Sequence, residues 1–235
     1  MKRCVSVAAV SAVLGLVYAA SAGATTLDLN LTVDNQFAVY LSSSDSVLGT
    51  FVGSGNAWQT TYSFSDPLGA GRQYIHVIAT NWTTDNGLWG SPGTPNGTGG
   101  NPDGFIGTFS ILGNGYKFAN GLTTLSTDTT DWRADPATPA DPPPWAPTAV
   151  PAWTAPTDAP QSYGVNGVGP WGGRGSISSG AEWIWSSPDN LNYAEFSTTI
   201  SSSVPESSTW AMLLCGFAGL GFAGYRARKA VPIAA

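Results

Sequence analysis

The clearest pattern in the chain is the strict alternation of apolar and polar residues along residues 27–33. Leucine or valine occupies every odd position there, and Asp, Asn or Thr occupies every even position. Successive side chains of a strand point to opposite faces, so this alternation is typical of a β-strand with one buried face. Apolar residues alternate again along 37–41, after a turn at Asp34-Asn35. The pattern predicts two consecutive strands.

Further strand-like runs follow between Gly, Pro, Asn and Asp turns, and no central stretch shows the 3.6-residue period of an amphipathic helix. Residues 74–80 are apolar on both faces, which favours a central strand between packed layers. Many short strands separated by turns predict an all-β fold, a single antiparallel β-sandwich or jelly roll over residues 25–203. The expected strands are 27–33, 37–41, 47–52, 60–64, 74–80, 105–112 and 193–200, with a Gly-rich turn at 53–56.

Two long loops interrupt the strands, residues 81–104 and residues 134–160. The first is rich in Gly, Asn and Pro, and the second contains nine prolines. Because proline cannot donate to a sheet ladder, we expect 134–160 to be extended coil. Too little strand-forming sequence follows it to build a second core, so we expect this segment to lie over the sandwich.

Both ends of the chain combine an apolar run with basic residues. Residues 1–24 begin with two cations and close with small residues, the pattern of a secretory signal peptide; an uncleaved anchor helix is the alternative. Residues 210–225 are a second apolar run, bracketed by Trp210 and Tyr225 and followed by Arg-Ala-Arg-Lys. Interfacial aromatics and flanking cations predict a transmembrane helix with a cytoplasmic basic tail. A buried core helix is the alternative for this run.

A specific motif precedes the second apolar run. Val204, Pro205, Glu206 and Ser207 are followed in order by the apolar helix and the basic tail, over residues 204–229. This segment resembles the bacterial PEP-CTERM sorting signal, although Ser207 stands where that family has a second proline. The resemblance implies export, transient anchoring in the inner membrane, and cleavage by an exosortase-type sorting enzyme. It implies delivery to the cell surface or the biofilm matrix.

A second, looser resemblance covers most of the centre of the chain. Short motifs occur in order at residues 33–40, 77–81, 103–106, 130–132, 169–172, 181–185 and 193–196. They resemble the motifs of galactose-binding-like jelly-roll domains, which accompany sugar-cleaving enzymes. The resemblance implies a β-sandwich that packs or binds, without carrying over a sugar site. Two positions depart from the family's pattern, because residues 42–45 replace an N-G turn and Ser197 replaces an arginine.

Composition excludes several kinds of partner and active site for the centre of the chain, residues 25–203. All 15 acidic residues lie between Asp28 and Glu206, whereas five of the nine basic residues lie near the two ends. A region so poor in cations would repel a phosphate backbone, which excludes nucleic acid as a partner. With His76 as the one histidine and no cysteine in the centre, His triads, Cys nucleophiles, disulfide frameworks and zinc sites are excluded. The apolar neighbours of His76 predict a hydrogen-bonded core histidine.

The tryptophan content is the most unusual feature of this sequence, and nine of the ten tryptophans lie in the centre. Indole rings stack on pyranose rings, and amides or carboxylates bind the hydroxyls. Trp82 and Trp89, with Asn81, Asp85 and Asn86 beside them, are therefore candidate carbohydrate-binding residues, and packing of both indoles is the alternative. The tryptophans in or beside strands are expected to pack in the core or cover its edges: Trp58, Trp132, Trp171, Trp183 and Trp185.

Asp128, Asp131 and Asp135 crowd one short segment. Carboxylate oxygens suit Ca²⁺, and calcium outside the cell fills even weak sites, so these residues are a candidate calcium site. A solvated acidic loop is the alternative, and we expect no other cofactor.

These features predict an exported, non-catalytic β-sandwich protein of the cell surface or the exopolysaccharide matrix, with carbohydrate as its candidate ligand. The first alternative is a structural matrix protein without a specific ligand. The second is a small carbohydrate-active hydrolase, which would need paired carboxylates in a cleft. No pair of acids stands out in the sequence, so we do not expect an enzyme.

Overall fold

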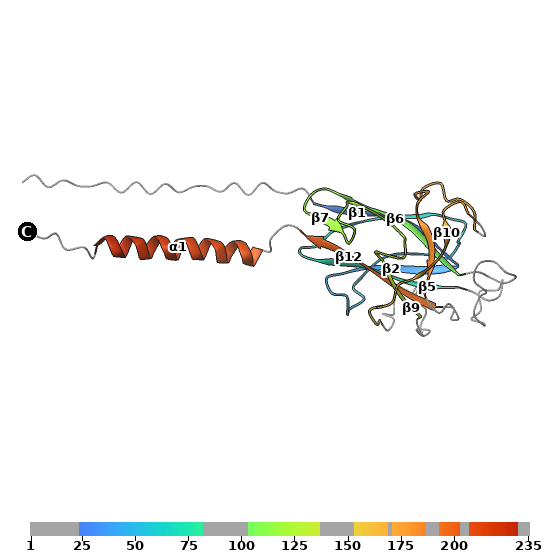
Figure 1. The fold of residues 1–235 in the computed structure, drawn as a ribbon, viewed down its shortest axis with the longest axis horizontal. Helices are drawn as coiled ribbons and strands as arrows, with labels where there is room; N and C mark the ends of the chain where they lie inside the picture. The colour runs from blue at the N-terminus through green and yellow to red at the C-terminus, as the bar shows by residue number, and fades with distance from the viewer. Residues whose placement is uncertain are drawn as a thin grey trace, which may run out of the picture.

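The computed structural model describes residues 24–81, 103–136, 153–168, 171–186, 193–202 and 207–229. Strands in these ranges form two antiparallel sheets of six strands each, which pack face to face (Figure 1). A helix follows the last strand. The prediction of an all-β antiparallel sandwich is therefore confirmed.

Sheet A has the order β10-β11-β6-β1-β4, with β8 paired to β6. β1 lies between β6 and β4, and its alternating sequence gives it one apolar face, on which the odd-numbered residues 27–33 are all buried. Its even-numbered residues Asp28 and Asn30 face outward and are half-buried. The strands of sheet A are β1 (Thr26–Asp34), β4 (Tyr62–Pro67), β6 (Gly104–Leu112), β8 (Thr124–Ser126), β10 (Gln161–Val165) and β11 (Glu182–Trp185).

Sheet B has the order β3-β2-β5-β12-β7, with β9 paired to β12. β5 is its middle strand and is buried on both faces, as its apolar residues on both sides predict. β2 is buried along its whole length. The strands of sheet B are β2 (Gln36–Ser42), β3 (Thr50–Gly55), β5 (Gln73–Thr80), β7 (Tyr116–Phe118), β9 (Arg133–Pro136) and β12 (Tyr193–Ser202).

Large aromatic side chains fill the space between the sheets. The ring of Phe105 lies 5.2 Å from that of Trp132 and 4.9 Å from that of Phe196, measured between centroids. Phe109 lies 5.1 Å from Trp132. Burial of such rings is the main favourable term in folding. The expectation that Trp132, Trp171, Trp183 and Trp185 pack is confirmed, because all four are buried.

The predicted boundary of the third strand is wrong. The strand runs over Thr50–Gly55, so it includes two glycines of the predicted turn at 53–56. A Cβ on Gly53 would overlap the ring of Phe64, and one on Gly55 would lie 2.5 Å from the ring of Tyr62. These glycines therefore sit in a strand because the aromatic rings occupy the space that a side chain would need.

The expectation of coil throughout 134–160 is also wrong at its start. Arg133–Pro136 forms β9, in which Pro136 pairs with Ala194 of β12. β9 is an edge strand, where proline is tolerated because no further ladder is needed. The short strands β7, β8 and β10 were not predicted either, since three to five residues are too few to show a period.

The two ends of the sandwich carry different connections. Thr26 pairs with Leu112, and Ser202 pairs with Tyr116, so the start of β1 and the end of β12 flank the same turn between β6 and β7. At the opposite end, β5 finishes beside the start of β12, where Thr80 pairs with Tyr193. The segment between β5 and β6 thus leaves and re-enters the sandwich at the end away from the terminal connections.

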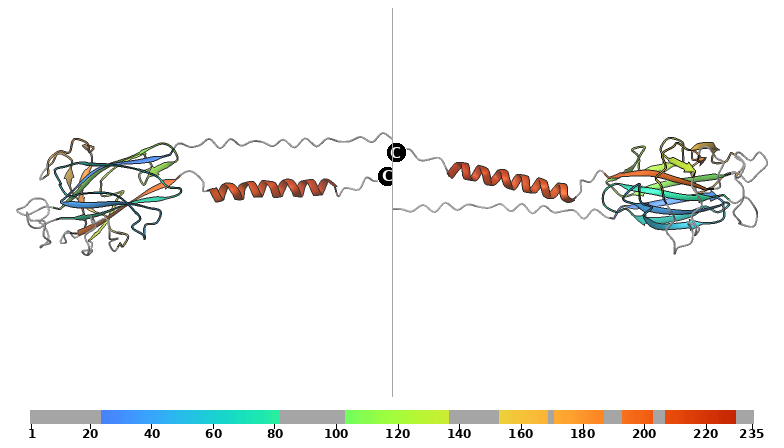
Figure 2. Two further views of the ribbon diagram at one scale, coloured as in Figure 1. Left: turned by 180° about the vertical axis from the view of Figure 1, so that it is seen from behind. Right: turned by 90° about the horizontal axis from the view of Figure 1, so that it is seen from below.

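Helix α1 (Ser207–Lys229) includes the predicted helical run 210–225 and stands apart from the sandwich (Figure 2). Its described side chains are exposed. In the part of the chain that the structure describes, no helix is both long and apolar enough to cross a membrane. The transmembrane helix over 210–225 stays a prediction. The predicted signal peptide lies outside the described residues, apart from Ala24.

Candidate functional site

Of the predicted carbohydrate-binding residues, the structure describes Asn81 alone. Asn81 is fully buried, and its side-chain amide donates a hydrogen bond to Oδ1 of Asp103, the residue before β6. This bond ties the two sides of the 81–104 loop together, so Asn81 has a structural contact rather than an exposed amide. Trp82, Asp85, Asn86 and Trp89 lie outside the described residues.

The predicted calcium ligands do not come together as a metal site. Oδ1 of Asp128 accepts hydrogen bonds from the backbone N–H groups of Thr130 and Asp131, a local turn contact. Asp135 lies in β9 and binds backbone N–H groups of Thr157 and Asp158. Among the described residues, no group of three or more His, Cys, Asp or Glu side chains is placed to hold a metal ion. Calcium binding by Asp128, Asp131 and Asp135 therefore stays a prediction.

Residues 204–206 of the predicted sorting motif lie outside the described residues, and Ser207 is the first residue of α1. The sorting signal itself stays a prediction.

Trp153 and Trp58 are the half-buried tryptophans whose side chains the structure describes. The guanidinium of Arg174 covers the ring of Trp58, with Cζ 4.9 Å from the ring centroid. Trp153 lies on the other side of the molecule, against the outer face of sheet B, where it packs on Tyr40, Leu48 and Ile78. These two indoles are therefore held in different ways.

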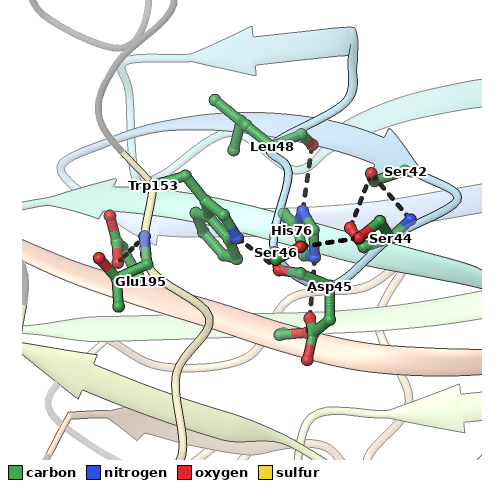
Figure 3. A network of polar contacts seen from close by, with 10 residues as sticks. Ser42, Ser44, Asp45, Ser46, Leu48, His76, Trp153 and Glu195 are labelled. Atoms are coloured by element: carbon green, nitrogen blue, oxygen red, sulfur yellow. Dashed lines mark hydrogen bonds and ion pairs between the residues drawn. The ribbon is translucent and has the colours of Figure 1, made fainter.

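A polar network holds Trp153 on sheet B (Figure 3). Its ring stacks on the imidazole of His76, with centroids 4.1 Å apart and an angle of 27° between the planes. Its Nε1–H donates to the backbone carbonyl of Asp45 at 2.7 Å. A stacked pair contributes about 1 kcal/mol, and a neutral hydrogen bond contributes about the same. Both contacts together fix the tilt and the rotation of the indole.

His76 lies on β5 beneath this indole and is 0% exposed. Nδ1 lies 3.0 Å from the carbonyl oxygen of Leu48, and Nε2 lies 3.0 Å from Oδ1 of Asp45. The prediction of a hydrogen-bonded, buried histidine is confirmed. Burial lowers the pKa of His76, while the bonds to Leu48 and Asp45 act in the opposite direction.

The geometry also fixes where protons are needed. A carbonyl only accepts, so Nδ1 of His76 carries the hydrogen in its bond to Leu48. Nε2 then faces Oδ1 of Asp45, and when Nε2 carries a proton this contact is an ion pair. Ser197 adds a second donor, because its hydroxyl binds the same Oδ1 at 2.6 Å.

Residues 153–158, which we name the strap, continue from Trp153 across the outer face of sheet B. The backbone N–H of Thr154 donates to Oε2 of Glu195 at 3.4 Å. Asp135 accepts from the N–H of Thr157 at 3.0 Å and from that of Asp158 at 3.1 Å. Ala134 in turn donates to the carbonyl of Asp158 at 2.8 Å. The strap is therefore bound through two neighbouring carboxyl side chains.

Glu195 is the more unusual of these two carboxyls. It lies on β12 and is 8% exposed, and Asp135 is its direct cross-strand partner. Burial raises the pKa of Glu195 to about 7, the bond from Thr154 lowers it, and the charge of Asp135 raises it. Glu195 therefore exchanges its proton near neutral pH.

A second carboxyl with a raised pKa lies between the sheets. Burial raises the pKa of Asp34 to about 7, against the smaller effects of Trp171 and Arg174. Nε1–H of Trp171 donates to Oδ2 of Asp34 at 2.9 Å, and the Trp171 ring stacks on Trp183 at 4.4 Å. Asp34 thus fastens the end of β1 to the loop before β11.

Two surface grooves are described, and each contains a single carboxylate. One, of about 380 Å³, is lined by Asp66 together with residues from β2, β3 and β5. The other, of about 340 Å³, lies over β1 and β4 and contains Asp28. Glycoside hydrolysis needs two carboxyl groups facing one substrate. Glu195 and Asp135 are adjacent, but the strap covers Glu195.

Sequence reasoning missed Trp153, Asp45 and Glu195 as members of one site. Trp153 lies in the Pro-rich segment 134–160, and no sequence motif groups it with Asp45 or Glu195. Contacts in this site join distant parts of the chain: Trp153 binds Asp45 across 108 positions, and Ser197 binds Asp45 across 152. A usable signal in the sequence was His76 within a strand that is apolar on both faces, because a buried imidazole there needs hydrogen-bond partners above the sheet.

Compared with protein-family models, curated proteins and solved structures, the chain matches none of them.

Proposed function

We propose that this protein is exported, sorted through its C-terminal segment, and acts without catalysis at the cell surface or in the extracellular matrix. An exosortase-type enzyme at the inner membrane is the proposed sorting partner, and exopolysaccharide is the proposed ligand. The galactose-binding-like jelly-roll relationship of the sandwich is part of the same proposal.

The observation that carries the proposal is the separation of connections between the two ends of the sandwich. Thr26 and Ser202 lie beside the turn at one end, and the 81–104 segment joins the sandwich at the other, where Thr80 pairs with Tyr193. A domain held through either terminal segment would present its opposite end to the surroundings. That end carries the junctions of the loop with Trp82 and Trp89.

Charge supports the choice of ligand. The region from Asp28 to Glu206 contains 15 acids and four bases. Such a region repels anionic polymers and favours uncharged partners, among which neutral polysaccharides are hydroxyl-rich and abundant at cell surfaces.

Fractionation of cells tests export and sorting. We expect the protein in the envelope or the medium, with residues 1–24 and the basic tail removed from the mature product, as measured by intact mass. A full-length protein in the soluble cytosolic fraction would contradict the proposal. A Glu206→Gln variant should accumulate unprocessed in the envelope, with Glu182→Gln as the matched control.

Binding to a glycan array tests the ligand. We expect the purified protein to bind neutral glycans, and Trp82→Ala and Trp89→Ala to weaken that binding. Binding to no glycan would favour the alternative of a structural matrix protein, for which the burial of Trp132, Trp171, Trp183 and Trp185 is the supporting observation.

A further inference from the structure

We infer that Trp153 and the Asp45 carboxylate form a stacking subsite for an uncharged pyranose ring on the outer face of sheet B. This subsite is separate from the loop tryptophans Trp82 and Trp89. The inference rests on the proposed function for its ligand class, because it assumes that the protein meets carbohydrate.

The first argument is that Trp153 is rigid before any ligand arrives. One face of its ring lies 4.1 Å from the buried His76 ring, and its Nε1–H is bound to the Asp45 carbonyl at 2.7 Å. His76 is itself fixed at both nitrogens by Leu48 and Asp45. A ring that is already immobile loses little entropy when a ligand stacks on it, so more of the contact energy appears as affinity.

The second argument is that the indole keeps exposed surface. Four other described tryptophans are buried in the core, and Arg174 covers the ring of Trp58. Trp153 is half-buried, and its contacts with His76 and the apolar cluster lie toward sheet B. The part of the ring that remains exposed is therefore the part that a sugar ring can reach, with its C–H groups against the indole.

The third argument concerns hydrogen-bonding groups at the rim of this indole. The Asp45 side chain is 39% exposed. Its Oδ1 is used by His76 and Ser197, which leaves Oδ2 with no partner among the described residues. Ser44 and Ser46 bind each other at 2.9 Å on the exposed surface of the same loop. An aromatic plane with an adjacent carboxylate and hydroxyls is the set of groups that carbohydrate sites use.

Charge selects an uncharged ring. The Asp45, Asp135 and Glu195 carboxyl groups lie on the same face as Trp153, and Asp158 lies on the strap. β9, which pairs with β12, carries the cation Arg133, but its guanidinium is already bound to the carbonyls of Thr130 and Trp132. A uronic acid or a sulfated sugar would place a further negative charge beside these acids, which costs free energy.

Calorimetry with the full-length protein tests the subsite. The probes are hexasaccharides of β-1,4-glucose, β-1,3-glucose and β-1,4-galactose, with hexagalacturonate as the anionic control. We expect at least one neutral probe to bind and hexagalacturonate not to bind. Trp153→Ala should weaken the binding about tenfold, and Trp153→Phe should weaken it less. Trp58→Ala is the matched control, a half-buried tryptophan in the loop between β3 and β4, and should stay within twofold of the wild type.

A measurement on the unmutated protein tests the subsite without depending on whether a variant folds. N-bromosuccinimide oxidises accessible indoles, and peptide mass spectrometry locates the product. A saturating neutral probe should protect Trp153 and leave the oxidation of Trp58 unchanged. Equal oxidation of Trp153 with and without the bound probe would overturn the subsite.

The outcomes separate the two proposals. If Trp82→Ala or Trp89→Ala abolishes binding while Trp153→Ala does not change it, the carbohydrate function stands and the subsite is wrong. If no neutral probe binds, the subsite is wrong and so is the carbohydrate ligand, whereas export and sorting are decided by fractionation alone.

Discussion

The two outer faces of the sandwich differ in how far their polar side chains are exposed to water. On sheet A, Ser63 and Ser65 are exposed, and each donates a hydrogen bond to a neighbouring side chain of β1, Asn30 or Asp28. On sheet B, the corresponding outer positions of β5 and β12 are buried, His76 and Ser197 among them. One face meets water, and the other lies under a further layer of chain.

The difference shows what covering a polar face requires. An exposed serine that loses its hydrogen-bond partner bonds to water instead, so the free energy of unfolding changes little. A buried polar group without a partner lowers the free energy of unfolding by about 1–3 kcal/mol. Sheet B meets this requirement with the 43–49 loop and the strap, which supply Leu48, Asp45 and Thr154 as partners. The cost remains visible at Glu195, whose pKa burial raises to about 7.

The largest expected effect is at His76. His76→Ala removes a buried ring, two hydrogen bonds and the stack on Trp153, and should lower the free energy of unfolding by about 3–4 kcal/mol. Asn30→Ala on the outer face of sheet A is the matched control and should lower it by less than about 1 kcal/mol. Urea unfolding measures both, and equal losses would remove the distinction between the faces.

The second prediction concerns pH. Burial raises the pKa of Glu195 from its ordinary 4.5 to about 7, so the folded protein holds this proton more tightly than the unfolded chain. Its stabilising contribution is therefore complete below about pH 4.5 and is lost as the pH rises through 7. The full shift corresponds to about 3 kcal/mol. Urea midpoints between pH 4.5 and 8 should fall with rising pH.

Glu195→Gln tests that assignment, since an amide of the same shape does not titrate in this range. The variant should show a flatter decline in urea midpoint than the wild type. Asp34 acts in the same direction, with its pKa raised to about 7, so Asp34→Asn should remove a further part of the slope. His76 acts oppositely, because burial lowers its pKa and its contribution is lost as the pH falls. An unchanged slope in Glu195→Gln would contradict the prediction.

The third prediction concerns the strap. Trp153→Ala removes a stack and a hydrogen bond and should lower the free energy of unfolding by about 2 kcal/mol. The strap should also open locally, because Trp153 anchors one end of it. Hydrogen exchange at the amides of Ala134, Thr157 and Asp158 should accelerate. Exchange in β1 should change only as global stability does. Undisturbed strap amides would mean that Asp135 alone holds the strap.

The smallest expected effect comes from a pair of matched serines. Ser65 donates to Asp28 at 2.7 Å on the exposed face, and Ser197 donates to Asp45 at 2.6 Å under cover. Ser65→Ala should lower the free energy of unfolding by less than about 0.5 kcal/mol, and Ser197→Ala by about 1–2 kcal/mol. The chemistry of the two bonds is the same, so any difference in urea unfolding measures burial. Equal values would show that the strap does not exclude water.

The sequence predicted the parts of the fold that depend on local pattern. β1 follows from its alternation, β5 from its apolar residues on both faces, and the burial of His76 from its apolar neighbours. The edge strand β9 was missed because its pairing with β12 is made by residues about 60 positions away, and its proline argued against a strand. The acids at 128, 131 and 135 were grouped by proximity in sequence, yet Asp135 faces the strap in the folded chain.

By itself, the sequence determined that the centre is an antiparallel β-sandwich, because side-chain alternation is a property of each strand. It also determined the anionic, cation-poor character of that centre. Tertiary structure alone decided that one outer face is covered, and that Trp153, His76, Asp45 and Glu195 share a site. The physical reason is that a third layer is built from contacts such as the one between Trp153 and Asp45, 108 positions apart, which no local period encodes.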